Sequence, residues 1–114
     1  MKSVEFEEIF ESNSDLIWDY DFLSSCNYLT YKLVRNNLNR PWNLKKISRN
    51  NNITIDDIID SPFIRWDWKE LTLNESMTFE IIKDNPMHPW NTDILKEKLT
   101  DEQLQEFYNI RESS

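Results

Sequence analysis

The chain of 114 residues contains no glycine, and it contains no alanine either. Glycine supplies the positive φ angles and close backbone approaches that phosphate-binding loops, GxGxxG turns and nucleophile elbows require. The sequence therefore argues against the enzyme classes built on these elements. The lack of both residues, beside 13 asparagines and 12 isoleucines, is typical of coding by an AT-rich genome.

Cysteine and long apolar runs are also scarce. Cys26 is the only cysteine and cannot form an internal disulfide, and with His88 it provides too few ligands for a zinc site. No charged segment followed by an apolar run opens the chain, and no stretch approaches the roughly 18 apolar residues of a membrane span. We therefore expect an intracellular protein that is not secreted, with no membrane contact, metal or cofactor, and with His88 in a turn.

The net charge of −8 is unevenly distributed. Residues 1–21 hold seven acids and one base, residues 22–55 hold six bases and no acid, and the remainder holds 14 acids and six bases. The basic middle suggests two alternatives: a nucleic-acid stripe with Tyr28, Tyr31 and Trp42 interleaved for stacking, or a flank that meets the acidic end of another copy. The candidate binding residues in it are Lys32, Arg35, Arg40, Lys45, Lys46 and Arg49.

Tryptophans mark an internal repeat. Trp18, Trp42, Trp66 and Trp90 are each separated by 24 residues. In each unit an acid or amide follows the tryptophan and an aliphatic residue lies five positions after it. A threonine lies twelve positions after the first three tryptophans, whereas the fourth unit is two residues shorter and reaches its threonine at Thr100. Repeats of about 20 to 50 residues are typical of arrays in which each unit packs on the next.

The period predicts an all-α fold: a short helical-repeat solenoid of 24-residue, two-helix units with capping helices at both ends, near residues 3–13 and 100–111. Helices of two turns are marginal in water, so their stability has to come from stacking. We expect a single domain over 1–114 with a partial N-terminal repeat or cap in 1–17, full repeats at 18–41, 42–65 and 66–89, and a partial repeat with a C-terminal cap in 90–114.

The first helix of each unit is expected to begin at the tryptophan. Pro41 and Pro89 directly precede two of the tryptophans, and proline suits a helix entrance because the N–H it lacks would have no partner there. The turn at residues 49–52 is rich in asparagine, which tolerates the left-handed conformation in a chain without glycine. Asparagine is therefore expected to replace glycine in the turns.

The second helix of each unit is expected to begin at the threonine. Its hydroxyl can accept a hydrogen bond from a free backbone N–H, and Thr54 with Asp57 and Thr100 with Gln103 match capping boxes. The helix should stop before a proline, because the residue preceding proline avoids helical ψ angles. The closing prolines of the second and third units are Pro62 and Pro86.

The recurring apolar residues form the predicted core. An aromatic groove for a ligand is the alternative, but one aromatic residue per unit at constant phase is what a stacked array buries. Trp68 is a candidate interface anchor, because its counterparts Tyr20, Leu44 and Thr92 vary in size and polarity. The predicted structural core consists of Trp18, Trp42, Trp66, Trp90, Leu23, Ile47, Leu71, Leu95, Ile53, Met77, Val34, Ile58 and Ile82.

Clustered carboxylates raise the question of catalysis. Paired acids can act as general acid and base, but these positions fit helix starts and exposed faces, where a negative charge is favourable. We therefore expect no catalytic residue, no small-molecule substrate and no enzyme activity. The acids concerned are Asp56, Asp57, Asp60, Asp101 and Glu102.

Residues 16–100 resemble the tryptophan- and asparagine-rich tandem repeat proteins of mimivirus-like giant DNA viruses. The motif runs from Pro41-Trp42-Asn43-Leu44 through Ile47-Ser48-Arg49-Asn50 to Ile53-Thr54, and continues in Trp66-Asp67-Trp68 and Leu71-Thr72. The first unit departs from it at Tyr20, Cys26 and Leu38. The resemblance implies a viral protein, in the host cytoplasm or the virion, with no established catalytic activity, and it carries no functional residues over.

Together these features predict a noncatalytic helical-repeat scaffold or protein-interaction module whose partner is another protein or a second copy. The alternative is a nucleic-acid-associated protein that uses residues 32–49.

Replacing a repeating tryptophan by alanine tests the predicted core. Trp42→Ala and Trp66→Ala should each lower the free energy of unfolding by about 3 to 5 kcal/mol, as large core truncations do. Melts followed by circular dichroism measure this loss. Unchanged melts in both variants would mean that these side chains are not in the core.

Overall fold

The computed structural model describes residues 2–113, and its regular structure is entirely helical, with no strand in that range. The all-α prediction is therefore confirmed. The helices are α1 (Ser3–Ser12), α2 (Tyr20–Ser24), α3 (Tyr31–Arg35), α4 (Leu44–Arg49), α5 (Ile55–Asp60), α6 (Trp68–Leu73), α7 (Phe79–Asp84), α8 (Thr92–Lys98) and α9 (Asp101–Ser113).

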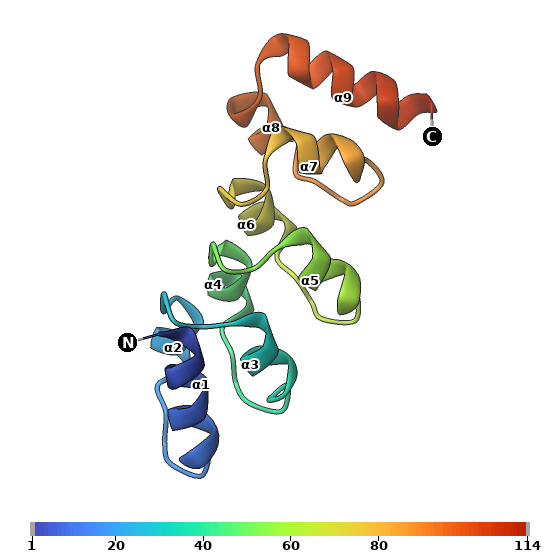
Figure 1. The fold of residues 1–114 in the computed structure, drawn as a ribbon. Coiled ribbons are helices and arrows are strands. Elements are labelled where there is room, and N and C mark those ends of the chain that lie inside the picture. Colours follow the sequence, from blue (N-terminus) through green and yellow to red (C-terminus); the bar gives the residue numbers. More distant parts are fainter. Residues whose placement is uncertain (1, 114) are drawn as a thin grey trace.

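The helices form two rows along an elongated molecule of 49 × 24 × 20 Å. The even-numbered helices stack in one row, in which α4 packs on α2 and α6, and α6 packs on α8 (Figure 1). Helices α3, α5 and α7 project from the other side, and the turns after α1, α3, α5 and α7 follow one another along one edge of the molecule (Figure 1). At the C-terminal end, α9 packs on α7 and α8.

Each repeating tryptophan lies in the extended segment before an even-numbered helix. That helix begins two residues later, and the acid or amide between them is the N-cap, whose side chain accepts a hydrogen bond from a backbone N–H. The prediction that the helix begins at the tryptophan is therefore wrong, and Pro41 and Pro89 belong to the extended entrance. The N-caps are Asp19, Asn43, Asp67 and Asn91.

The four indoles make the same hydrogen bond. Each Nε1–H donates to the backbone carbonyl five residues earlier, which lies just after an odd-numbered helix, at 2.8 to 3.0 Å. The indole thereby ties the end of one helix to the start of the next, and each acceptor carbonyl also receives the backbone N–H three residues after it. The acceptors are the carbonyls of Asn13, Asn37, Ser61 and Asn85.

Twelve of the thirteen predicted core side chains are buried; Trp18 is half-buried. Tyr20 packs edge-on against Trp42, and Trp68 packs in the same way against Trp90, each from the preceding unit. No even-numbered helix precedes α2 in the described part of the chain, so Trp18 lacks this cover and instead contacts Phe10. The core also includes Phe10, Leu29 and Leu33, which were not among the predicted residues.

A buried hydroxyl joins each even-numbered helix to the following one. It donates to the carbonyl four residues earlier in its own helix, at 2.6 to 2.7 Å. It also accepts the backbone N–H of the next N-cap, at 2.9 to 3.0 Å. The hydroxyl residues are Ser24, Ser48 and Thr72, and the N-caps that donate to them are Asn43, Asp67 and Asn91.

A buried amide makes a second link. The Nδ2 group of Asn74 donates to the carbonyls of Ser48 and Asn50 in the preceding unit, at 2.9 and 3.0 Å, and its Oδ1 accepts the N–H of Ser76. Asn50 bonds in the same way to the unit before it. Asparagine therefore links units and does not replace glycine: no residue in 2–113 has a positive φ, so the predicted left-handed turns are wrong.

The first and last units depart from this pattern. In the fourth unit the Nζ group of Lys98 replaces the amide and donates to the carbonyls of Thr72 and Asn74, at 2.8 and 3.0 Å. Burial of this amine lowers the pKa of Lys98. In the first unit Cys26 occupies the amide position, and no even-numbered helix precedes α2 in the described residues.

The predicted starts of the second helices are confirmed. Thr30, Thr54 and Thr78 are the N-caps of α3, α5 and α7. The capping box of Thr54 with Asp57 is present, and Thr100 and Gln103 exchange the same pair of hydrogen bonds before α9. Helices α5 and α7 end two residues before their prolines, at Asp60 and Asp84.

Asn74→Ala should lower the free energy of unfolding by about 2 to 4 kcal/mol, because it removes three hydrogen bonds with the backbone and leaves the Ser48 carbonyl and the Ser76 N–H without partners inside the protein. Asn51→Ala is the matched control, since Asn51 is exposed and its neighbour Asn50 makes the interunit bonds. Urea unfolding of both variants measures the difference. Equal stabilities would show that the amide does not hold the units together.

Candidate interaction surface

Four of the six basic residues in the middle segment form ion pairs with three acids from other helices. Arg35 pairs with Asp60 at 3.3 Å, and Lys46 pairs with Asp21 at 2.5 Å. The hydrogen bonds from Lys46 and Asn43 lower the pKa of the Asp21 carboxyl. The remaining two pairs converge on one carboxylate: Arg49 and Lys45 lie 3.2 and 4.0 Å from the Glu70 oxygens, and the Glu70 side chain is only 11% exposed.

The acids that pair with this segment lie outside it in the sequence. Asp21 and Asp60 are each 25 residues from their partners, and Glu70 is 21 residues from Arg49. Stacking of the units brings them into contact. The separation of acidic and basic segments in the sequence is therefore not a separation in space.

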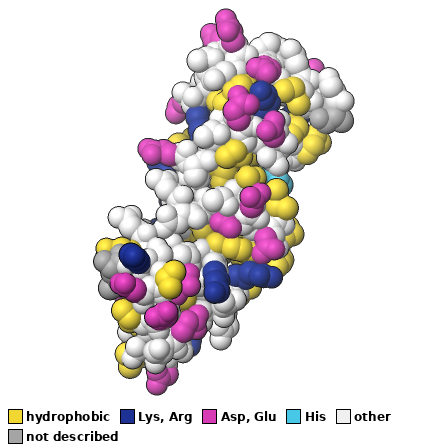
Figure 2. Space-filling model, in the orientation of Figure 1, with side chains coloured by type: hydrophobic (Ala, Val, Ile, Leu, Met, Phe, Trp, Pro, Cys, Tyr) yellow, Lys and Arg dark blue, Asp and Glu magenta, His cyan; other side chains and the backbone are white. Residues whose placement is uncertain are grey.

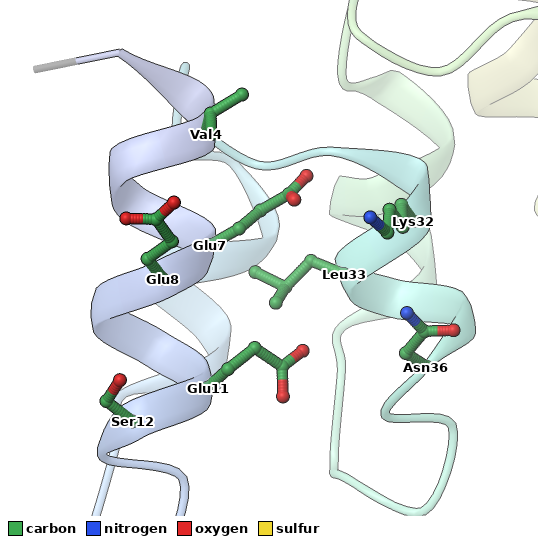
Figure 3. A pocket seen from close by; sticks show the side chains of 8 residues that line it. All are labelled: Val4, Glu7, Glu8, Glu11, Ser12, Lys32, Leu33 and Asn36. Atoms are coloured by element: carbon green, nitrogen blue, oxygen red, sulfur yellow. The ribbon is translucent and has the colours of Figure 1, made fainter.

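The other two basic residues, Arg40 and Lys32, face α1 and the turn that follows it. The Arg40 guanidinium donates to the carbonyl of Ser14 at 2.8 Å. Lys32 is exposed and lines an open groove of about 540 Å³ between α1 and α3, into which Glu7 and Glu11 also reach (Figure 3). Each of these carboxylates is also hydrogen-bonded across the groove, and the donors are Thr30 and Asn37.

The aromatic residues of the middle segment are mostly engaged within the fold. Trp42 is buried, and the Tyr31 hydroxyl contacts Asp60 and Ser61, while Tyr28 remains 37% exposed. The expected interleaving of free aromatic rings with basic residues is therefore wrong for Trp42, whereas the Tyr31 ring is half-buried.

Two open pockets lie one unit apart beside the edge formed by the turns. Their volumes are about 260 and 360 Å³. Their linings correspond at a spacing of 24 residues, so they are the same feature in successive units. The corresponding residues are Val34 and Ile58, Leu38 and Pro62, Trp42 and Trp66, and Leu44 and Trp68.

The half-buried side chain of Trp68 lines the second pocket. His88, in the turn after α7 as predicted, stacks on the Trp68 ring with 5.1 Å between centroids and 20° between planes. The edge contact with Trp90 lies at 5.2 Å. Trp68 is therefore held in place by the fold while part of its surface remains accessible.

Exposed apolar side chains accompany the two pockets. Leu38, Ile59, Phe63 and Met87 are 44, 53, 68 and 67% exposed, and all lie in or next to the turns of this edge. In Figure 2 hydrophobic side chains gather on the right-hand side of the molecule, where Figure 1 places the turns after α5 and α7. Apart from Trp68, this edge could not be predicted from the sequence, because its exposed residue types do not recur and the available signal was only apolar residues beside helix-ending prolines.

The carboxylates considered for catalysis do not converge on a pocket. Asp57 caps α5 and Asp60 contacts Tyr31 and Arg35, whereas Asp56, Asp101 and Glu102 are exposed. Burial is the main cause that raises the pKa of Asp57. Among residues 2–113 no three His, Cys, Asp or Glu side chains are grouped so that they could hold a metal ion.

None of the helices in the described range is both long and apolar enough to cross a membrane. Comparisons with family models, curated proteins and solved structures found no match for this chain. Its function is therefore inferred from its own residues.

Proposed function

We propose that this chain is a noncatalytic helical-repeat solenoid that acts as an intracellular scaffold or protein-interaction module. The observation that carries the proposal is the recurrence, at 24-residue spacing, of three interunit links: the indole, the hydroxyl and the amide. Its units follow the tryptophans, at 18–41, 42–65 and 66–89, between the partial units 1–17 and 90–114. Its origin would be a giant virus, as the sequence resemblance implies.

The departures in the outer units support capped ends. The amide position is lost at Cys26, in the unit whose helix α2 follows no other even-numbered helix within residues 2–113, and the hydroxyl position is lost at Lys96, after which the described chain continues into α9. Helix α9 has 13 residues, packs on α7 and α8, and exposes Asp101, Glu102 and Glu106. Arrays of this kind need polar outer faces at their ends to remain soluble.

The polar groups support a structural and binding role. Buried hydroxyls and amides form hydrogen bonds with the backbone of neighbouring units, and Glu70 forms ion pairs with Arg49 and Lys45. The surface that remains is long, with open apolar pockets along one edge. Contiguous exposed apolar surface marks sites of protein interaction.

The nucleic-acid alternative is tested by binding of DNA and RNA as a function of salt. We expect no binding at physiological salt, because four bases of the middle segment are already engaged in ion pairs with acids of the same chain. The comparison is a combined Lys45→Glu, Lys46→Glu and Arg49→Glu variant, checked for folding by circular dichroism. Tight, salt-sensitive binding that this variant loses would replace the proposed function.

Capture of protein partners tests the proposal itself. Tagged wild type, Phe63→Ala and Phe22→Ala are used as baits in infected cells; Phe63 and Phe22 are 68 and 65% exposed, and Phe22 lies on α2, away from the edge. We expect proteins retained by the wild type and by Phe22→Ala to be depleted at least fivefold with Phe63→Ala, as loss of about 1 kcal/mol implies. Identical capture by all three baits would contradict binding through this edge.

A further inference from the structure

The first of the two edge pockets combines an apolar floor with a basic rim. Val34, Trp42 and Leu44 line it, and two arginines, Arg40 and Arg65, also contribute to its lining. Arg65 is exposed, and none of the acids in residues 2–113 forms an ion pair with it. This pocket, here called the socket, fits an apolar side chain that is accompanied by a carboxylate.

The turn at residues 14–17, here called the tip, has the complementary character. Ile17 is 104% exposed and Leu16 is 56% exposed, although aliphatic side chains of this size are usually buried. The tip also carries Asp15 and is followed by Asp19, both exposed, and neither forms an ion pair with a lysine or arginine of the described chain. The tip is therefore apolar and acidic.

The tip cannot fill the socket of its own molecule. Arg40 is part of the socket lining and donates to the Ser14 carbonyl at 2.8 Å. This hydrogen bond holds the tip on the side of the turn at residues 38–41 that faces α1. The socket opens beyond that turn, where Phe63 and Ile64 of the next turn complete it. Figure 1 shows the turn after α1 and the turn after α5 separated by the turn after α3.

We propose that the socket receives the tip of a second copy of this chain. Leu16 and Ile17 enter the apolar pocket, and Asp15 and Asp19 face Arg40 and Arg65. Release of water from the pocket and from the exposed aliphatic side chains favours the contact, and the opposite charges orient it.

The contact is heterologous, since tip and socket are different surfaces of the same molecule. Each associated pair retains one free tip and one free socket, so assembly continues head to tail or closes into a ring. This inference rests on the proposed function and names the partner of the edge as another copy.

Sedimentation velocity of the full chain, from about 10 μM to 1 mM, tests the proposal, since a small interface is expected to be weak. The wild type should show a sedimentation coefficient that rises with concentration and falls back at high salt. A tip variant, Leu16→Asp with Ile17→Asp, and a socket variant, Phe63→Asp with Arg65→Glu, should each remain monomeric. All four substituted side chains are exposed, and circular dichroism verifies that both variants fold.

Mixing the two variants provides the decisive comparison. The tip variant keeps an intact socket and the socket variant keeps an intact tip, so the mixture should recover a 1:1 dimer that cannot extend further. Phe22→Asp is the control for a charge placed on an exposed aromatic residue, and it should associate as the wild type does. A mixture that stays monomeric beside an associating wild type would overturn the tip-to-socket contact.

A wild type that is monomeric over the whole range would also overturn it. In that case the edge would serve a different protein, and the proposed function would still be judged by the capture comparison of Phe63→Ala with Phe22→Ala. Association that persists in both variants would likewise contradict the proposal and would locate the self-contact elsewhere.

Discussion

Very short helices leave many of their backbone N–H and C=O groups without partners, and in this chain side chains supply those partners, many of them across the boundary between units. Helices of five to seven residues make up both rows between α1 and α9. The Ser48 hydroxyl holds the amide of Asp67, and the Asn74 amide holds the carbonyls of Ser48 and Asn50. Because buried polar groups without partners are costly, one unit cannot separate from the next without a large loss of stability.

This constraint also determines which surface is left for function. Most of the basic residues that the sequence offers as binding candidates lie where stacked units meet. They pair there with acids of neighbouring units, as Arg49 does with Glu70. The turns along the other edge contribute backbone carbonyls to the indole hydrogen bonds, but their apolar side chains take no part in these ion pairs. Apolar side chains such as Phe63 and Met87 therefore remain exposed there, beside pockets that recur from unit to unit. On the proposed function, the helices serve to hold this edge in a regular order.

The sequence allowed the helices, the threonine N-caps and most of the core to be predicted, because these depend on residues close together in one unit. Two local errors arose from plausible competing signals. Pro41 before Trp42 suggested a helix entrance, although Asn43 was the better N-cap, and the asparagines suggested left-handed turns, although their side chains bond to the preceding unit. Contacts between residues 19 to 26 positions apart, including those of Asp21 with Lys46 and of Arg49 with Glu70, depend on how the units stack. The exposed edge was missed because its residue types vary between units.

Hydrogen exchange at the backbone amides of Asn43, Asp67 and Asn91 tests the role of the interunit links most directly. These three amides donate to the hydroxyls of the preceding unit. They should be protected as strongly as helical amides such as that of Ile82, which bonds to the Thr78 carbonyl, and all should exchange in one cooperative opening. If the three amides instead exchange as fast as exposed turn residues while the helical amides stay protected, the units are not held together by these hydrogen bonds.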